Sequence, residues 1–251
     1  FVNVTLDPAL TYGAYAVGDS NPDLMDLYEL VKKDGQSFLE RCRILFHGDG
    51  AAIPSGNDRP RYEHLRDVFN AKKIDPALDA VGIGRSEMFV YLNRHCFNGL
   101  CRYNSKGKFN VPFGRYKGPS VPHDDILLFH KQIQSVTFTA GDYTKMLATL
   151  NPGDGDVVYL DPPYVPLSAT ASFTDYSNDG GFPMAKQEEL AKLAEKYSAQ
   201  GAAVLVSNQD TTVSRDLYKN ASSIHAFEVT RFISAAGKSR NKAPELIAVY
   251  K

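Results

Sequence analysis

Apolar residues recur at helical spacing in the first half of the chain. A helix begins near Pro22, a residue suited to the first helical turn, and a short apolar strand over residues 12–18 precedes it and ends in Asp19. The apolar face of this helix consists of Leu24, Leu27, Tyr28 and Val31. The same spacing predicts helices over residues 36–47, 59–72 and 87–94.

Short apolar runs alternate with one helical pattern in the second half of the chain. The helix is predicted over residues 185–199, and buried-type strands are predicted over residues 136–140, 156–160 and 201–207. Two further runs, residues 226–233 and 246–250, flank a polar turn and predict a hairpin that closes the sheet. This alternation favours an α/β fold with a mostly parallel, doubly wound, Rossmann-like sheet.

Three of the predicted strands are followed by an acidic residue: Asp19, Asp142 and Asp161. In doubly wound sheets, ligands bind at the carboxyl ends of the strands. We therefore expect the chemistry of this protein at these three positions.

The strongest local motif is Asp161-Pro162-Pro163-Tyr164, directly after a predicted buried strand. Two prolines make the turn rigid, and the Asp161 carboxylate and Pro162 carbonyl provide neighbouring acceptors for the two N–H groups of an exocyclic amine. Accepting both bonds draws the nitrogen toward tetrahedral geometry, and Tyr164 can stack on the base for about 1–3 kcal/mol. The structural alternative is a rigid turn with a surface aspartate.

Residues 88–123 contain no acidic residue, and basic side chains alternate there with aromatic ones. We call residues 88–123 the basic stretch. Positive charge neutralises phosphate, Arg and Asn read base edges, and aromatic rings wedge between bases, so this composition favours DNA binding. The alternative is a solvated basic loop.

A second acid-free stretch, residues 229–244, predicts a hairpin tip that grips phosphates, or equally a solvated turn. Its candidate contacts are Arg231, Lys238 and Arg240.

Composition restricts the remaining classes. The chain has 251 residues and a net charge of −1, so a nucleic-acid site requires local segregation of charge. The three cysteines, Cys42, Cys96 and Cys101, lack metal-binding or disulfide spacing, which favours free thiols in a reducing compartment and no metal. No run has the length of a membrane helix, so we expect a cytoplasmic protein. We also expect it to be a monomer in solution.

The tetrapeptide and two further blocks together resemble the Dam family of DNA adenine N6-methyltransferases, of the D12 class. These blocks are residues 91–104, 107–117 and 161–174, and the similarity extends along the whole chain. The resemblance implies S-adenosylmethionine as methyl donor, GATC in double-stranded DNA as target, and flipping of the adenine before direct transfer. The implied catalytic residues are Asp161, Pro162, Pro163 and Tyr164.

The resemblance also implies roles in reading DNA. Arg102 reads a guanine, Leu100 touches a thymine, and Asn98 lies with Phe97 at the gap left by the flipped adenine. Close relatives often carry Tyr in place of Phe97, and Phe keeps the stacking face without the hydroxyl. The further implied DNA contacts are Arg94, Asn104, Asn110, Arg115, Tyr116, Lys117 and Ser168.

For the methyl donor, the resemblance implies that Asp19 binds the ribose hydroxyls and Asp142 the adenine amino group. Tyr143 would pack on that ring, and Asp161 would border the same site. The alternatives are an ordinary helix cap at Asp19 and an ordinary Gly-Asp-Tyr turn at Asp142.

The sequence departs from the family at its beginning. The Lys-Trp-Ala-Gly-Gly-Lys-like segment and the Phe-x-Gly-x-Gly turn of Dam-like enzymes are absent, and the chain has no Trp. We therefore expect an N-terminally incomplete chain that lacks the first strand and the Gly-rich turn of the sheet. A catalytic domain is predicted over residues 1–35 and 134–251, with a target-recognition domain over residues 36–133 between them.

Two other functions deserve comparison. A cytosine-C5 methyltransferase requires a cysteine nucleophile, and none of the three cysteines follows a proline. A non-catalytic Dam-like DNA-binding protein would keep the basic stretch, but the intact tetrapeptide argues against it.

Overall fold

A computed structural model describes residues 12–48, 59–73, 75–114, 116–165, 182–230 and 242–251. The chain forms two compact units, each discontinuous in sequence. Unit 1 contains residues 1–102 and 108–148, and unit 2 contains residues 103–107 and 149–251. The predicted target-recognition domain, residues 36–133, does not coincide with either compact unit. That functional division stays a prediction.

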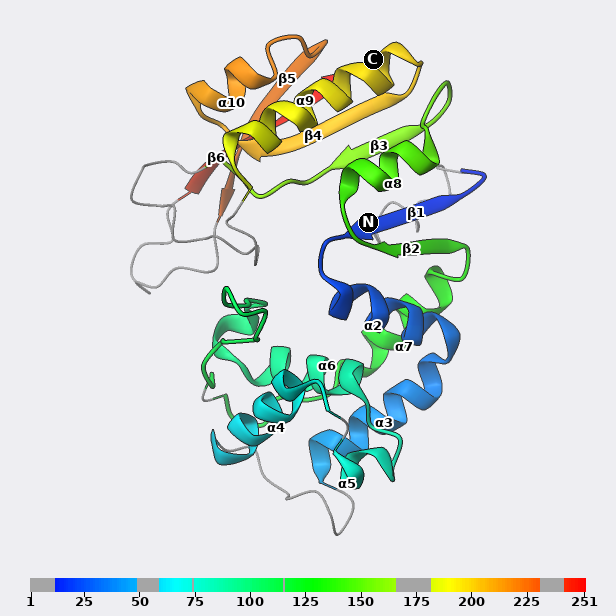
Figure 1. The fold of residues 1–251 in the computed structure, drawn as a ribbon, viewed down its shortest axis with the longest axis vertical. Coiled ribbons are helices and arrows are strands. Elements are labelled where there is room, and N and C mark those ends of the chain that lie inside the picture. The colour runs from blue at the N-terminus through cyan, green and yellow to red at the C-terminus, as the bar shows by residue number, and fades with distance from the viewer. Residues whose placement is uncertain (1–11, 49–58, 74, 115, 166–181, 231–241) are drawn as a thin grey trace. The chain divides into compact units, whose positions relative to one another are not determined.

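Unit 1 combines two parallel strands with a group of helices (Figure 1). Its elements are β1 (Tyr15–Asp19), α2 (Pro22–Lys33), α3 (Gly35–His47), α4 (Arg59–Ala71), α5 (Pro76–Asp79), α6 (Arg85–His95), the 3-10 helix η1 (Phe97–Gly99), α7 (His123–Gln132), β2 (Val136–Ala140) and α8 (Tyr143–Leu150). Asn21 caps α2 by accepting a hydrogen bond from the Asp23 N–H at 3.0 Å, and Pro22 follows it.

One face of the β1–β2 pair is covered by α2 (Figure 1). Val136 and Phe138 point into the core while Thr137 and Thr139 are exposed, as the alternation of side chains along a strand requires. Buried Phe38 and Leu39 of α3 belong to the same core.

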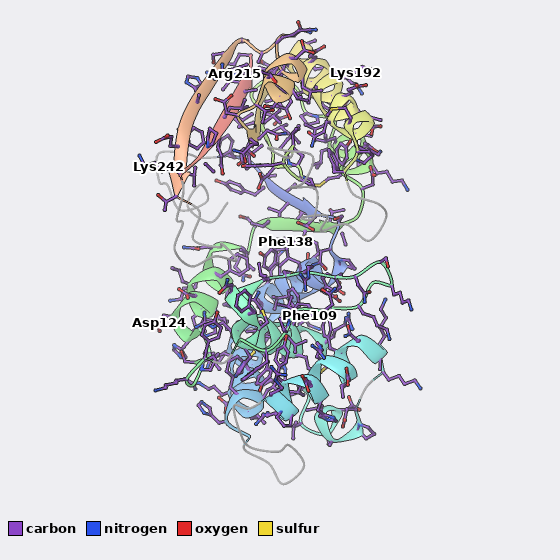
Figure 2. All side chains as sticks on the ribbon, turned by 90° about the vertical axis from the view of Figure 1, so that its left-hand side faces the viewer. Phe109, Asp124, Phe138, Lys192, Arg215 and Lys242 are labelled. Atoms are coloured by element: carbon purple, nitrogen blue, oxygen red, sulfur yellow. The ribbon has the colours of Figure 1, made fainter. Side chains whose placement is uncertain are left out.

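A second core lies between α4, α6 and the basic stretch. Phe109, labelled in Figure 2, is 1% exposed and packs edge-to-face on Phe69 and Phe89. An ion pair between Arg85 of α6 and buried Asp23 of α2 ties the two helices together. The basic stretch is therefore fixed to the helical framework by apolar burial.

Unit 2 contains a four-stranded sheet in the order β3-β4-β6-β5. Its elements are β3 (Val157–Leu160), α9 (Met184–Ala199), β4 (Ala203–Gln209), α10 (Thr212–Leu217), β5 (Ser223–Thr230) and β6 (Lys242–Tyr250). β3 and β4 are parallel, while β4–β6 and β6–β5 are antiparallel. Helix α9 packs on β4 and β6, and its exposed face carries Lys192 (Figure 2).

The structure confirms an α/β fold, the predicted strands and the closing hairpin, with shifts of a few residues at their ends. The prediction that the strand at residues 156–160 is buried was wrong, because Val157 and Tyr159 of β3 are 50% and 59% exposed. Two of the described strand pairings are parallel and two are antiparallel, so the prediction of mostly parallel pairing was wrong for these strands. Helices α5, α7, α8 and α10 were not predicted. Among the described residues, no helix is both long enough and apolar enough to cross a membrane.

Candidate active site

The turn over residues 161–164 directly follows β3. Asp161 is exposed, Pro162 is buried and Tyr164 is half-buried. In the parallel pairing of β3 with β4, Leu160 lies opposite Val206. The next residues along the two strands, Asp161 and Ser207, are therefore neighbours.

One oxygen of Asp161 is already engaged. The Ser207 hydroxyl, which is 3% exposed, donates to Asp161 Oδ1 at 2.6 Å. Its distance to the Leu160 carbonyl is 3.4 Å, so its single proton favours the carboxylate. Within the described part of the chain, no donor reaches Asp161 Oδ2.

The two proline carbonyls of the turn differ. Gln187 of α9 donates from Nε2 to the Pro163 carbonyl at 2.7 Å. No donor from the described residues reaches the Pro162 carbonyl. The turn therefore offers two neighbouring acceptors, Asp161 Oδ2 and the Pro162 carbonyl, which suits a group with two N–H donors.

Tyr164 keeps its phenolic proton at neutral pH. Burial raises its pKa to about 12, a side-chain hydrogen bond with Ser207 partly offsets this rise, and the charges of Asp161 and Glu245 add smaller increases. Its hydroxyl lies 3.5 Å from Glu245 Oε2, at the outer limit of a hydrogen bond. A phenol that keeps its proton at neutral pH is better suited to stacking than to proton transfer.

A buried polar cluster behind the turn was not predicted. It comprises Gln187 of α9, Asn208 of β4 and Tyr218, which are 2%, 0% and 0% exposed. A sequence signal existed, because a buried strand that begins Ala-Val-Leu-Val ends in Ser-Asn-Gln. Polar residues buried at the carboxyl end of a strand lie where sites form in α/β sheets.

The predicted donor-site residues lie at the ends of neighbouring strands: Asp19 is the last residue of β1, and Asp142 follows β2. Asp19 lies opposite Ala140 in the parallel pairing, and the Gly141 N–H donates to the Asp19 carbonyl at 2.9 Å. Asp19 Oδ1 accepts from the Asn21 N–H at 2.7 Å. Asp142 Oδ1 accepts from the Thr144 N–H at 2.8 Å, beside half-buried Tyr143 at the start of α8. Both acids thus make local turn contacts as well.

The basic stretch brings three predicted residues together. Asn98 has a left-handed backbone with φ of 55°, and its N–H donates to the Tyr116 hydroxyl at 2.8 Å. Phe97 and Tyr116 are each 43% exposed, and the Phe97 N–H donates to the Pro112 carbonyl at 2.8 Å. Phe97 and Tyr116 therefore each present an exposed ring next to Asn98, Phe97 through the chain and Tyr116 through this hydrogen bond.

Arg102 is held by its neighbour Asn110. Its Nε donates to Asn110 Oδ1 at 2.8 Å and its Nη2 to the Asn110 carbonyl at 3.2 Å. One edge of the guanidinium is thus fixed by the protein, which orients the rest of its planar fork.

Helix α4 anchors the same segment through residues that were not predicted. The Asn70 side chain bonds both backbone groups of Phe109, at 2.8 and 2.9 Å, and the Tyr62 hydroxyl donates to the Val111 carbonyl at 2.7 Å. From the sequence, the spacing of residues along this helix predicted only a face packed in the core, and it did not predict these hydrogen bonds.

The other predicted DNA contacts are less organised. Arg94 and Lys117 are exposed and Leu100 is half-buried. Asn104 Oδ1 accepts from the Lys106 N–H at 3.0 Å within its own turn. The remaining predicted contacts lie outside the described residues: Arg115, Ser168, Arg231, Lys238 and Arg240.

The cysteines are free thiols, as predicted. Burial raises the pKa of Cys96 to about 12 and that of Cys101 to about 11, and it raises the pKa of Cys42 as well. A thiol with a raised pKa is a poor nucleophile, which argues against cytosine-C5 chemistry. The described residues contain no group of three His, Cys, Asp or Glu side chains that could hold a metal.

Comparison with known proteins finds similarity along nearly the whole chain. The family model of the D12 class N6 adenine-specific DNA methyltransferases matches residues 6–233. The DNA adenine methylase of Escherichia coli K12 is 40% identical over 240 residues, which cover 96% of this chain and 80% of that protein. DNA adenine methylases of Serratia marcescens and Vibrio cholerae are also 40% identical, covering 96% and 94% of this chain and 83% and 79% of those proteins.

Proposed function

This chain belongs to the D12 class of N6 adenine-specific DNA methyltransferases, and from that premise we propose that it methylates the adenine of GATC sites in double-stranded DNA, with S-adenosylmethionine as donor. One observation carries the assignment of the catalytic residues. The turn at residues 161–164 leaves two adjacent acceptors without donors from the described residues, while the acceptors beside them are engaged.

The reacting amine of adenine has two N–H groups. Asp161 Oδ2 accepts one and the Pro162 carbonyl accepts the other, which draws the nitrogen toward tetrahedral geometry and exposes its lone pair. Tyr164 stacks on the base and keeps its proton, because its pKa lies far above neutral. The chain thus acts through positioning and electrostatics, without a covalent intermediate.

When bound, S-adenosylmethionine supplies an electrophilic methyl group. Acceptors suit its ribose hydroxyls, and Asp19 fits this requirement because no donor from the described residues reaches Oδ2. Asp142 and Tyr143 follow the neighbouring strand and would hold the adenine ring of the donor. Tyr143 supplies a ring face at the start of α8.

An adenine inside a duplex cannot reach such a turn, so the base must be flipped out of the helix. Phe97 is exposed beside the left-handed turn at Asn98, where a ring can fill the gap in the stack. Arg102, oriented by Asn110, would read O6 and N7 of a guanine, and Leu100 would touch a thymine methyl. The DNA contacts proposed outside the described residues are Arg115, Ser168, Arg231, Lys238 and Arg240.

We extend the proposal to the fold. The parallel pairs β1–β2 and β3–β4, together with the antiparallel hairpin β5–β6, are compatible with a Rossmann-like methyltransferase sheet. In this scheme residues 1–35 and 134–251 form the catalytic domain, and residues 36–133 recognise the target.

The test is transfer of labelled methyl from S-adenosylmethionine to duplexes that carry GATC or a scrambled site, using the full-length protein. The proposal expects label on the GATC adenine and little on the scrambled duplex. Equal labelling of both duplexes would remove the GATC assignment. Binding of GATC DNA without any labelling would contradict the proposed reaction.

A further inference from the structure

Four polar side chains are buried directly behind the turn at residues 161–164. They are Ser207 and Asn208 at the end of β4, Gln187 of α9, and Tyr218, and none is more than 3% exposed. Burial of a polar group is unfavourable unless it is hydrogen-bonded, so such a cluster requires a compensating arrangement.

Asn208 makes four hydrogen bonds. Its Oδ1 accepts from the Val165 N–H at 2.9 Å and from the Gln209 N–H at 2.8 Å. Its Nδ2 donates to Gln187 Oε1 at 3.2 Å and to the Tyr218 hydroxyl at 2.9 Å. The amide therefore uses its full bonding capacity and fixes both Gln187 and the backbone that leaves the turn.

Gln187 passes this constraint to the turn. Since its Oε1 is held by Asn208, its Nε2 is directed at the Pro163 carbonyl, 2.7 Å away. Ser207 acts on the other side of Pro162, through Oδ1 of Asp161 at 2.6 Å. The cluster thus engages the acceptors that flank the pair formed by Asp161 Oδ2 and the Pro162 carbonyl.

We propose that Ser207, Gln187 and Asn208 are positioning residues for methyl transfer, which select the two acceptors that hold the amine. Ser207 leaves one carboxylate oxygen for the substrate. Gln187, oriented by Asn208, fixes the Pro163 peptide and with it the direction of the neighbouring Pro162 carbonyl. This inference rests on the proposed function, because it concerns how the same turn presents its acceptors.

Ser207→Ala and Gln187→Met remove these contacts with little change in side-chain volume. We expect each to lower kcat about tenfold, because each loses one hydrogen bond that fixes a reacting acceptor. KM for DNA and for S-adenosylmethionine should stay within about twofold, since none of these side chains reads DNA or contacts the donor in this proposal.

Two control variants match these changes. Ser214→Ala removes another buried serine hydroxyl, which accepts the Thr211 N–H at 2.9 Å in the capping box of α10 and, among the described residues, has no hydrogen bond to residues 161–164. Gln200→Met makes the glutamine change at the exposed end of α9. Thermal unfolding of all four variants separates loss of stability from loss of positioning, and both controls should keep the wild-type kcat.

Wild-type kcat in Ser207→Ala and Gln187→Met, with kcat of Asp161→Ala lowered by about 10²-fold or more, would overturn this inference and leave the proposed function standing. A kcat loss in Ser214→Ala equal to that in Ser207→Ala, at equal loss of stability, would also overturn it. Absence of methyl transfer in the wild-type protein would instead overturn the proposed function.

Discussion

The turn at residues 161–164 and the basic stretch differ in how their polar side chains are held in place. The turn is supported from behind by fully buried amides and a hydroxyl, so its acceptors are fixed before any substrate arrives. The basic stretch carries exposed or half-buried side chains that support one another, as Tyr116 supports Asn98 and Asn110 supports Arg102.

This difference follows from what each region must do. A hydrogen-bond acceptor that binds the reacting amine must keep its position during the reaction. Buried side chains with all their hydrogen bonds formed are therefore favourable neighbours for it. A side chain that reads DNA must remain accessible and is oriented by partners that leave part of it uncovered. Changes in the turn should therefore affect the rate of transfer, and changes in the basic stretch should affect the choice of site.

The largest expected effect comes from Asp161→Ala. Loss of one acceptor for the amine should lower kcat by about 10²–10³-fold, the usual result of removing one preorganised partner of a reacting group. Affinity for GATC DNA should stay within about twofold of wild type, as measured by fluorescence anisotropy. The exposed acid Glu188 offers the control Glu188→Ala, which should leave both quantities unchanged.

The next effect concerns the stability of the basic stretch at low pH. His95 is 2% exposed, and its side chain donates from Nδ1 to the Tyr91 carbonyl at 2.8 Å. Its backbone carbonyl accepts a hydrogen bond from the Gly114 N–H of the basic stretch. Burial lowers its pKa to about 4, whereas an unfolded histidine titrates near 6.5.

The unfolded state therefore binds more protons than the folded state between those two pKa values. The stabilisation from a neutral His95 is complete above about pH 6.5 and is lost as pH falls toward 4, by up to about 3 kcal/mol. Urea unfolding followed by circular dichroism at several pH values measures it. His95→Gln should reduce the change in the free energy of unfolding between pH 6.5 and 4. The control His64→Gln, at an exposed position, should leave that change as in the wild type.

Arg102→Ala tests the reading of a guanine. We expect a loss of about 1–3 kcal/mol in discrimination at one guanine of GATC. Replacing that guanine by 7-deazaguanine, which lacks the N7 acceptor, should then cost the wild-type protein affinity but cost Arg102→Ala little. Arg94→Ala is a change of the same type at an exposed position, and it should lower the affinity for all duplexes by the same factor. Unchanged discrimination in Arg102→Ala would remove this assignment.

The smallest expected effect comes from Tyr116→Phe. The variant loses the hydroxyl that accepts the Asn98 N–H, a bond worth about 0.5–1.5 kcal/mol. Specific DNA affinity should fall by that amount while kcat at saturating DNA stays constant. Tyr250→Phe removes a buried hydroxyl that has no partner within the described residues, and it should leave DNA affinity unchanged.

Local patterns predicted the helices and strands with a clear period, such as α2, α9 and β2. They missed α7, whose apolar residues Ile126 to Phe129 are consecutive and show no helical spacing. The order of the strands in the sheets depends on pairing between segments that are distant in the sequence. The spacing of apolar residues along one segment carries no information about such pairing.

The candidate site divides in the same way. Asp161 was found because its tetrapeptide is local, and the structure adds the partner of each acceptor. Gln187 could not be found, because its contact with Pro163 depends on how α9 packs on the sheet. Asn110 was predicted as a DNA contact, but its hold on Arg102 depends on how the two segments pair.

The most direct test is the single-turnover rate of methyl transfer at saturating DNA, on GATC and on a duplex with one guanine replaced. We predict that Asp161→Asn lowers both rates in the same proportion and leaves their ratio at the wild-type value. Arg102→Ala should keep the GATC rate and bring the ratio closer to one. A change of the ratio by Asp161→Asn, or an equal loss of both rates by Arg102→Ala, would contradict the separation of chemistry from recognition.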